Sequence, residues 1–488
     1  MGVFDKYAAV LESLDPIKFT GVVERVQGLL IESLGPSAQV GELCQILVPK
    51  GRGVVWAEVV GLRGKTVQLM PYDEMEGIEI GNIVIAMGET LRVAVSDKLL
   101  GRTLDSMGKP IDEKGDIGSE EWYPAFNTPP DVLKRKRIRE ILATGVRSID
   151  ALLTVGKGQR IGIFSGSGIG KSTLLGMVAR NTSADVNVIA LIGERGREVR
   201  EFIENDLGPE GLARSVIVVS SSNKAPLARI RGAYVATAIA EYFRDRGKDV
   251  MLLFDSVTRF ARAQREIGLA IGEPPANRGF TPSVFSILPK LLERSGTSDN
   301  GSITGFYTIL VEGDDIDDPV SDNVRGILDG HIVLTRKLAS ANHYPAVDVL
   351  QSISRLAIAV TGPQTREACG RIRRLMATYA GAEDLISVGA YVKGSNPEID
   401  EAIEKHADIE RFLIQRIEEK APLEETLRLA GQIVGIEIPE EEMPQPRQER
   451  EGVAAEMPQP RQERERAAAE TPQGLEGRVE NAAVPVQA

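Results

Sequence analysis

The sequence contains few of the residues that build disulfide frameworks or metal sites. Two cysteines, Cys44 and Cys369, and three histidines occur among 488 residues. This scarcity excludes a disulfide framework and a Cys/His metal site. No apolar run reaches the roughly 18 residues that a membrane span needs, and the first residues, MGVFDKYAAV, do not have the pattern of a signal peptide. We therefore expect a cytosolic chain.

The chain also has fewer basic than acidic residues and few aromatic side chains. The formal net charge is -12, and aromatic residues make up 5% of the chain. From Glu437 onward there are 12 acidic and 6 basic residues, so this segment carries -6, half of the total. A ring translocase acting on RNA would need a basic surface with stacking aromatics, and residues 19–96 offer Trp56 and Tyr72 for stacking. We expect no nucleic-acid partner.

The N-terminal part of the chain contains two segments with different patterns of apolar residues. Residues 1–18 contain a short amphipathic helix, ended by Pro16, with Phe4, Tyr7, Ala8, Leu11 and Leu14 on one face. Packing on its own domain and docking to a partner both stay open for this helix. Residues 19–96 contain short β-type runs broken by glycine, which predict a small closed or sandwiched β domain.

The middle of the chain, residues 97–353, has the pattern of an α/β domain. After a turn-rich connector, apolar runs such as VNVIALIG and DVMLLFDS alternate with helical patterns. The runs are continuously apolar, which predicts a mainly parallel sheet covered on both faces, as in nucleoside triphosphatases. Residues 354–436 are predicted to form a mostly helical domain.

The last segment, residues 437–488, lacks the pattern of a folded domain. EMPQPRQERE occupies Glu442–Glu451 and again Glu456–Glu465, and a decayed third copy begins at Glu470. Proline and charge dominate these repeats and no apolar face is present, so we predict a disordered tail. Its role is either that of a solvated repeat expanded by duplication, which we favour, or that of a partner-binding segment.

The segment RIGIFSGSGIGKSTLLGMVARN, residues Arg160–Asn181, has the strand–loop–helix order of a phosphate-binding loop. Backbone N–H groups and the helix N-terminus would face the anion, and Lys171 would bridge the β- and γ-phosphates. The hydroxyl of Ser172 would bind Mg²⁺. Ser165 stands where the strict pattern has glycine. The predicted nucleotide-binding residues of the loop are Gly166, Ser167, Gly168, Ile169, Gly170, Lys171, Ser172 and Thr173.

Two further apolar runs end in acidic residues that would complete the site. KDVMLLFD places Asp255 at the C-terminal tip of a strand, where ligands gather in open α/β sheets. This carboxylate would hold Mg²⁺ through water. Glu194 follows the run VNVIALIG and would orient and polarise the attacking water. Arg195 and Arg259, which follow the two acidic residues, are candidates for the positive charge that phosphoryl transfer needs.

Longer motifs resemble a known family. They are GERGREVREFIE, FDSVTRFARAQREIGLAIGEPPANRGFTPSVFSILPKLLERSG, GSITGFYTILVEGDDIDDPVSDNVRGILDGHIVLTR and HYPAVDVLQSISR. Together they resemble the ATPase of flagellar and type III protein export, a family related to the catalytic subunit of rotary ATP synthases. The resemblance covers the chain from about Gly21 to Gly435 and implies a β-barrel, a RecA-like P-loop ATPase domain and a helical C-terminal domain.

The resemblance also implies roles for single residues. The phosphate ligand, the Mg²⁺ ligand and the Walker B carboxylate of the family correspond to Lys171, Ser172 and Asp255. Glu194 corresponds to the catalytic carboxylate, and Tyr344 to the aromatic residue that packs on adenine. Arg355 corresponds to an arginine finger presented to a neighbouring subunit, although the residues alone leave it open as a salt-bridge partner. The family thus implies a homohexameric ring that hydrolyses ATP with Mg²⁺.

Partners and location follow from the same resemblance. A stator-like regulatory protein would bind the N-terminal helix, and a central stalk protein and export chaperone–substrate complexes would meet the C-terminal domain. The ring would lie peripherally at the inner face of the cell membrane, at the export gate, and unload flagellar export substrates from their chaperones. The ATPase of a virulence injectisome stays open as an alternative. So does a rotary ATP synthase catalytic subunit, although its acidic C-terminal signature is not apparent here.

Overall fold

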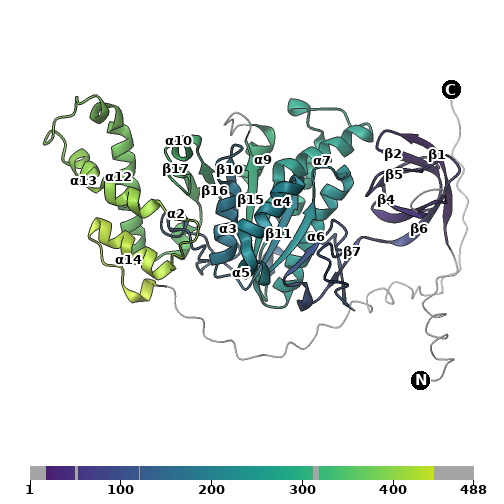
Figure 1. Ribbon diagram of the computed structural model, residues 1–488, viewed down its shortest axis with the longest axis horizontal. Coiled ribbons are helices and arrows are strands. Elements are labelled where there is room, and N and C mark those ends of the chain that lie inside the picture. The colour runs from purple at the N-terminus through teal and green to yellow at the C-terminus, as the bar shows by residue number, and fades with distance from the viewer. Residues whose placement is uncertain (1–17, 50–52, 120, 312–317, 444–488) are drawn as a thin grey trace, which may run out of the picture. The chain divides into compact units, whose positions relative to one another are not determined.

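The computed structural model describes residues 18–49, 53–119, 121–311 and 318–443 (Figure 1). The helix predicted at Phe4–Leu14 and the repeat from Pro444 onward lie outside these residues. Among the described helices, none is both long and apolar enough to cross a membrane. Along the chain, the described residues form a group of short strands, then a larger sheet with its helices, and then a helical group.

The first strands form a closed six-stranded β-barrel, in the order β1-β2-β5-β4-β3-β6. Side chains alternate between the barrel interior and its surface, so that Cys44, Ile46 and Val48 of β3 are all buried inside. The predicted β domain is therefore confirmed as a barrel. Its strands are β1 (Thr20–Gln27), β2 (Leu30–Leu34), β3 (Glu42–Val48), β4 (Gly53–Arg63), β5 (Thr66–Pro71) and β6 (Ile83–Thr90).

Tyr72, which follows β5, belongs to the buried cluster of the central sheet. Its hydroxyl donates a hydrogen bond of 2.7 Å to the carboxylate of Glu58, and this carboxylate also pairs with Arg231 of α6 (Pro226–Asp245). Because Tyr72 is buried, it cannot act as a stacking platform for a nucleic acid. Next along the chain, β7 (Arg92–Val95) pairs with β9 (Glu121–Pro124), outside the barrel.

The larger sheet has the order β17-β16-β10-β15-β13-β11-β12-β8. Its neighbouring strands are parallel except at one end, where β17 runs antiparallel to β16, and β14 (Gly296–Thr297) adds a short antiparallel pair to β15. The predicted mainly parallel sheet is confirmed. The strands are β8 (Arg102–Leu104), β10 (Arg160–Ser165), β11 (Val186–Ile192), β12 (Ser215–Ser220), β13 (Asp249–Asp255), β15 (Ser302–Leu310), β16 (Gly330–Leu334) and β17 (Val347–Ser354).

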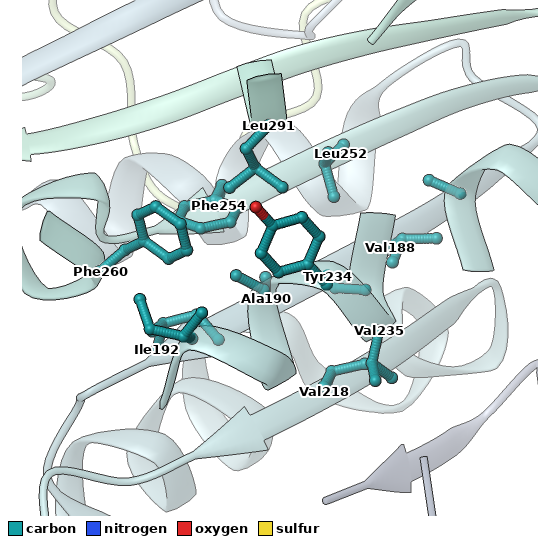
Figure 2. Close-up of a cluster of buried hydrophobic side chains, with 14 of the residues drawn as sticks. Val188, Ala190, Ile192, Val218, Tyr234, Val235, Leu252, Phe254, Phe260 and Leu291 are labelled. Carbon is teal, nitrogen blue, oxygen red and sulfur yellow. The ribbon is translucent and has the colours of Figure 1, made fainter. Parts of the chain in front are cut away.

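Helices cover both faces of this sheet, as its continuously apolar strands require. Successive residues of β11 point to opposite faces, Val188 into one buried cluster and Ile189 into the other. Figure 2 shows the first cluster, where strand side chains lie beside Tyr234 of α6, Phe260 of α7 and Leu291 of α8. The helices around the sheet are α2 (Arg147–Leu152), α3 (Lys171–Asn181), α4 (Gly196–Glu201), α5 (Gly208–Ala213), α6 (Pro226–Asp245), α7 (Val257–Ala270), α8 (Pro282–Leu292), α9 (Pro319–Ile327) and α10 (Arg336–Ser340).

The C-terminal helices follow β17 and share the second buried cluster with α2 and α3. The predicted helical character of residues 354–436 is confirmed. After a short helix, α11 (Ala357–Val360), come α12 (Pro363–Ser387), α13 (Pro397–Leu413) and α14 (Leu423–Val434). Gly435 ends α14 with a φ of +71°, in the left-handed region that favours glycine.

The fold continues beyond α14, where the sequence predicts the start of a disordered tail at residue 437. Residues 436–443, which we call the C-terminal strap, pack onto the helical group, with Ile438 and Met443 buried in its core. The carboxylate of Glu442 accepts hydrogen bonds at the N-terminus of α12. The predicted boundary is thus seven residues too early, because these anchors stand within a segment whose composition is that of the repeat.

Candidate active site

The predicted phosphate loop connects β10 to α3. Gly168 and Gly170 have φ angles of +76° and +90°, a region that residues with a Cβ rarely adopt. Ile169 between them is buried and anchors the loop in the core, whereas Ser167 is exposed. Gly170 caps α3, so the loop leads directly into the free N–H groups of a helix N-terminus. This geometry suits an anion such as a phosphate.

Three charged side chains meet beside the loop. The Nζ atom of Lys171, the first residue of α3, lies 2.5 Å from Oδ1 of Asp255 and 3.6 Å from Oε1 of Glu194. Asp255 ends β13 and Glu194 follows β11, and these neighbouring parallel strands end at the same edge of the sheet. The parallel topology thus brings together a lysine and two carboxylates that are far apart in sequence.

Arg259 of α7 completes this cluster. Its guanidinium donates through Nη2 to Glu194 at 3.0 Å and through Nη1 to the carbonyl oxygen of Gly193 at 2.7 Å. The helix start is fixed by Ser256, whose hydroxyl accepts from the backbone N–H of Arg259. Arg259 therefore places a positive charge at Oε2 of Glu194, whereas Lys171 lies near Oε1 of the same carboxylate.

The carboxyl group of Glu194 is strongly affected by its surroundings. Burial and the negative charge of Asp255 raise the pKa of Glu194 to about 7, against the lowering effect of Lys171 and Arg259. A hydrogen bond shared with Glu198 raises it further and lowers the pKa of Glu198. Glu194 therefore exchanges its proton near neutral pH, as a general base for hydrolysis at that pH requires.

The other predicted site residues occupy different places. The Cε1 atom of Tyr344 lies 3.4 Å from the position that a Cβ on Gly170 would occupy, so the ring lies against the loop. Arg195 has a side chain that is 77% exposed and pairs with Glu198 at 3.5 Å, outside the cluster around Lys171. Arg355 follows β17 and is exposed. Its role, like that of Arg195, stays a prediction.

The donor set beside Lys171 fits a magnesium ion. Mg²⁺ prefers hard oxygen ligands and keeps several of its waters. Asp255 offers carboxylate oxygens at the tip of β13, and its Oδ1 is oriented by a hydrogen bond of 2.7 Å from the hydroxyl of Thr308. Ser172 offers an exposed hydroxyl in the first turn of α3.

Three family models match the chain in the order of its folded parts. They are the ATP synthase alpha/beta family β-barrel domain over residues 23–88, the nucleotide-binding domain of the same family over residues 145–354, and the T3SS EscN ATPase C-terminal domain over residues 361–429. The "Flagellum-specific ATP synthase" of Treponema pallidum is 57% identical over 433 residues, covering 89% of this chain and 97% of that protein.

The chain belongs to the flagellar and type III secretion export ATPases.

Other members of this export ATPase family are similarly close. The "Flagellum-specific ATP synthase" of Bacillus subtilis is 54% identical, with 88% of this chain and 98% of that protein covered. The "Type 3 secretion system ATPase" of Xanthomonas euvesicatoria is 50% identical, with 84% and 92% covered. The solved structure of the assembled ATPase EscN from enteropathogenic E. coli superposes with a TM-score of 0.81 at 44% identity, covering 85% of this chain and all of that one. The export ATPase described here is accordingly an ATP-hydrolysing enzyme.

Some residues of this export ATPase site have no motif that identifies them. Thr308, which orients Asp255, is a polar residue inside the apolar run SITGFYTIL, and a hydroxyl in a fully buried strand is the signal that could have found it. Arg336 at the start of α10 donates to the carbonyl oxygen of Ser167 at 3.5 Å. Glu198, which shares a hydrogen bond with Glu194, is one of several charged residues in its segment, and local sequence does not distinguish it.

Proposed function

We propose that this export ATPase works as a homohexameric ring in which each nucleotide lies between the phosphate loop of one subunit and Arg355 of the next. ATP hydrolysis around the ring would energise the export of flagellar proteins, by unloading them from their chaperones at the export gate. The location of Arg355 relative to its own loop carries this proposal.

Arg355 is too far from the phosphate loop of its own subunit to act there. In the sheet, Ser165 at the loop end of β10 pairs with Leu334 of β16, which in turn pairs with Val347 of β17. Arg355 follows Ser354, at the other end of β17. Ser354 pairs with Gly330 of β16, four residues before Leu334. At about 3.3 Å per residue, the two ends are separated by roughly 13 Å along the sheet, which exceeds the reach of an arginine side chain.

The exposure of Arg355 supports contact with another molecule. Its backbone N–H is fixed by the carbonyl oxygen of Asp329 at 3.0 Å, while its guanidinium is exposed and makes a long hydrogen bond, of 3.4 Å, to the carbonyl oxygen of Arg325. A fixed backbone position with an exposed charged end is what a finger supplied in trans requires. The EscN structure, described as assembled, supports a ring by analogy.

Within each subunit we assign the remaining roles to the cluster beside the loop. Lys171 would bind the β- and γ-phosphates, and Glu194 would hold the attacking water and accept its proton. Mg²⁺, held by Ser172 and by Asp255 through water, would neutralise the charge that develops on the phosphates. Arg259 would keep Glu194 aimed at the water, and Tyr344 would pack on adenine.

The partners and the location are part of the same proposal. A structure of EscN is described as a complex with its central stalk EscO, superposing with a TM-score of 0.79, and this supports a stalk partner for the C-terminal helices of our chain. We further propose a stator-like protein at the N-terminal helix and a peripheral position at the cytoplasmic face of the membrane.

The flagellar system is favoured over an injectisome because the relatives with 57% and 54% identity are both flagellar. Deleting the gene should then abolish swimming, and intact swimming with lost effector injection would assign the injectisome instead.

Mixing two inactive variants tests the ring. Arg355→Ala should lower the hydrolysis rate by about 10³-fold or more, as for fingers supplied in trans, and Glu194→Gln should be inactive as well. In an equimolar mixture, about one interface in four joins an intact Glu194 to an intact Arg355 if subunits mix at random. Steady-state hydrolysis of the mixture should therefore recover to a sizeable fraction of the wild-type rate.

The controls distinguish a catalytic site between subunits from one formed by the phosphate loop of a single subunit. Arg374→Ala, which removes an exposed arginine of α12, should hydrolyse ATP like the wild type. Specific activity should rise with protein concentration as rings assemble. A mixture no more active than its components, or Arg355→Ala with wild-type activity at every concentration, would contradict the proposed site between subunits while leaving the phosphate loop intact.

A further inference from the structure

Tyr344 is held by the helical C-terminal group from two sides. On one side its neighbour His343, which is 5% exposed, makes a hydrogen bond of 3.0 Å through Nδ1 to the carboxylate of Glu410 in the last turn of α13. On the other side the carbonyl oxygen of Tyr344 accepts a hydrogen bond of 2.9 Å from the backbone N–H of Gln415. The two bonds fix the backbone on both sides of the aromatic ring.

Gln415 is itself fixed by three further hydrogen bonds. Its buried side chain accepts from the backbone N–H of Arg147 at 2.9 Å and donates to the carbonyl oxygens of Gly145 and Glu419 at 2.8 and 3.0 Å. A Cβ on Gly145 would lie 2.2 Å from Cβ of Asn181, at the C-terminal end of the phosphate-loop helix α3. The segment after α13 is thus joined to the base of that helix as well as to Tyr344.

The ring of Tyr344 has no comparable restraint of its own. It is 39% exposed, and its contact with the phosphate loop lies at Gly170, where it faces a residue without a side chain. The position of the ring over the loop therefore depends on the backbone of residues 343–345, and this backbone is tied to α13. A gap of about 0.5–1 Å already removes a quarter to a half of the dispersion attraction between two packed groups.

We infer that Glu410 and Gln415 are positioning residues for Tyr344, through which α13 sets the affinity of the site for the nucleoside part of ATP. The inference rests on the proposed contact between Tyr344 and adenine. Neither residue touches the nucleotide, and the phosphates are bound by a different set of groups at the loop. Loss of the His343–Glu410 bond therefore weakens binding of the base and leaves binding of the phosphates unchanged.

The experiment compares ATP with inorganic triphosphate, which has no base, on the full-length protein with Mg²⁺. Glu410→Ala should raise KM for ATP about three- to tenfold, the loss expected for one hydrogen bond, with kcat unchanged. Its affinity for triphosphate, measured by calorimetry, should equal that of the wild type. Glu410→Gln keeps an oxygen acceptor for His343 and should restore the KM. Glu404→Ala, which removes an exposed carboxylate from the same helix, should leave both measurements unchanged.

Each other outcome overturns a specific statement. If Tyr344→Ala raises KM but Glu410→Ala does not, the positioning role of Glu410 is wrong and the contact of Tyr344 with adenine stands. If Tyr344→Ala leaves KM unchanged, the proposed contact with adenine is wrong and the inference falls with it. If Glu410→Ala weakens ATP and triphosphate equally, it acts on the loop or on the fold, and the inference is wrong.

A milder substitution protects the test against misfolding. Glu410→Asp keeps the charge but withdraws the carboxylate by one methylene group from His343. It should raise KM for ATP in the same direction as Glu410→Ala, again without a change for triphosphate. A KM equal to that of the wild type for both substitutions would contradict the inference.

Discussion

Glu194 is the residue whose chemistry depends most on its neighbours. It lies 6% exposed between the cationic groups of Lys171 and Arg259, with the carboxylate of Asp255 close by. Burial and the charge of Asp255 raise its pKa to about 7, so that the free enzyme holds a mixture of protonated and ionised Glu194 at neutral pH. A general base must be ionised to accept a proton, so the proposed role of Glu194 implies that acid removes its active form.

The pH dependence of hydrolysis should show this. Because kcat/KM reports groups of the free enzyme, it should fall about tenfold per unit as the pH drops below about 7. Glu198→Gln should move this acidic limb to lower pH, since the hydrogen bond with Glu198 is one cause of the raised pKa of Glu194. Initial rates at low ATP concentration would measure this pH dependence, at pH values from about 5.5 to about 8.5 in steps of about half a unit. A kcat/KM that is constant down to pH 6 would contradict the assignment of Glu194.

At the scale of single elements, the C-terminal strap fixes the start of α12. The carboxylate of Glu442 accepts hydrogen bonds from the backbone N–H groups of Gln364 and Thr365, at 3.0 and 2.8 Å, and from the hydroxyl of Thr365 at 2.8 Å. A Cβ on Gly362 would lie 2.1 Å from the Glu442 carboxyl carbon, so a glycine before the helix leaves room for the cap. An acidic group at this end also suits the helix dipole.

Removing this cap should destabilise the protein measurably. Glu442→Ala should cost about 1–2 kcal/mol, as the loss of a helix cap with three hydrogen bonds, and Glu441→Ala, at an exposed neighbouring position, should cost almost nothing. Although burial opposes it, the bonds from Thr365 and Gln364 hold the pKa of Glu442 below its ordinary value of 4.5. The difference in melting temperature between wild type and Glu442→Ala should therefore be present above pH 4.5 and disappear as the pH falls through the lowered pKa. Equal melting temperatures at neutral pH would contradict the role of the cap.

The sequence predicts best those elements whose structure is determined by residues close together in the chain. The run RIGIFSGSGIGKS contains the strand, the glycines with positive φ and the helix start within one segment. The parallel sheet could likewise be predicted, because central strands such as β11 and β13 are buried on both faces.

Contacts between distant segments could not be predicted in the same way. The bond from His343 to Glu410 spans 67 residues, and neither residue belongs to a periodic pattern that would pair it with the other. The raised pKa of Glu194 depends on its burial and on Asp255, which the folded sheet brings near. The sequence pattern includes most of the strap in the tail, because Glu442 and Met443 have the same sequence there as in a repeat copy, and composition cannot distinguish the copy that packs.

At the scale of the whole molecule, the folded part should end at the strap. A chain that stops after Met443 should melt and hydrolyse ATP like the full-length protein, because it keeps all the packing that the described residues show. A chain that stops after Gly435 should be less stable than Glu442→Ala, because Ile438 and Met443 also lose their burial. Thermal unfolding and hydrolysis rates of the two truncated chains measure this. Reduced stability of the longer one would show that residues beyond Met443 belong to the fold.

The position of Glu442 has a genetic consequence. It is the first residue of the first repeat copy, and the described fold uses that residue and Met443 from the copy. Any unit that duplication adds after this copy would therefore lie downstream of the anchor. Gain or loss of a whole unit changes neither the reading frame nor the anchor residues. Strains should therefore differ in the number of units while the folded ATPase stays the same.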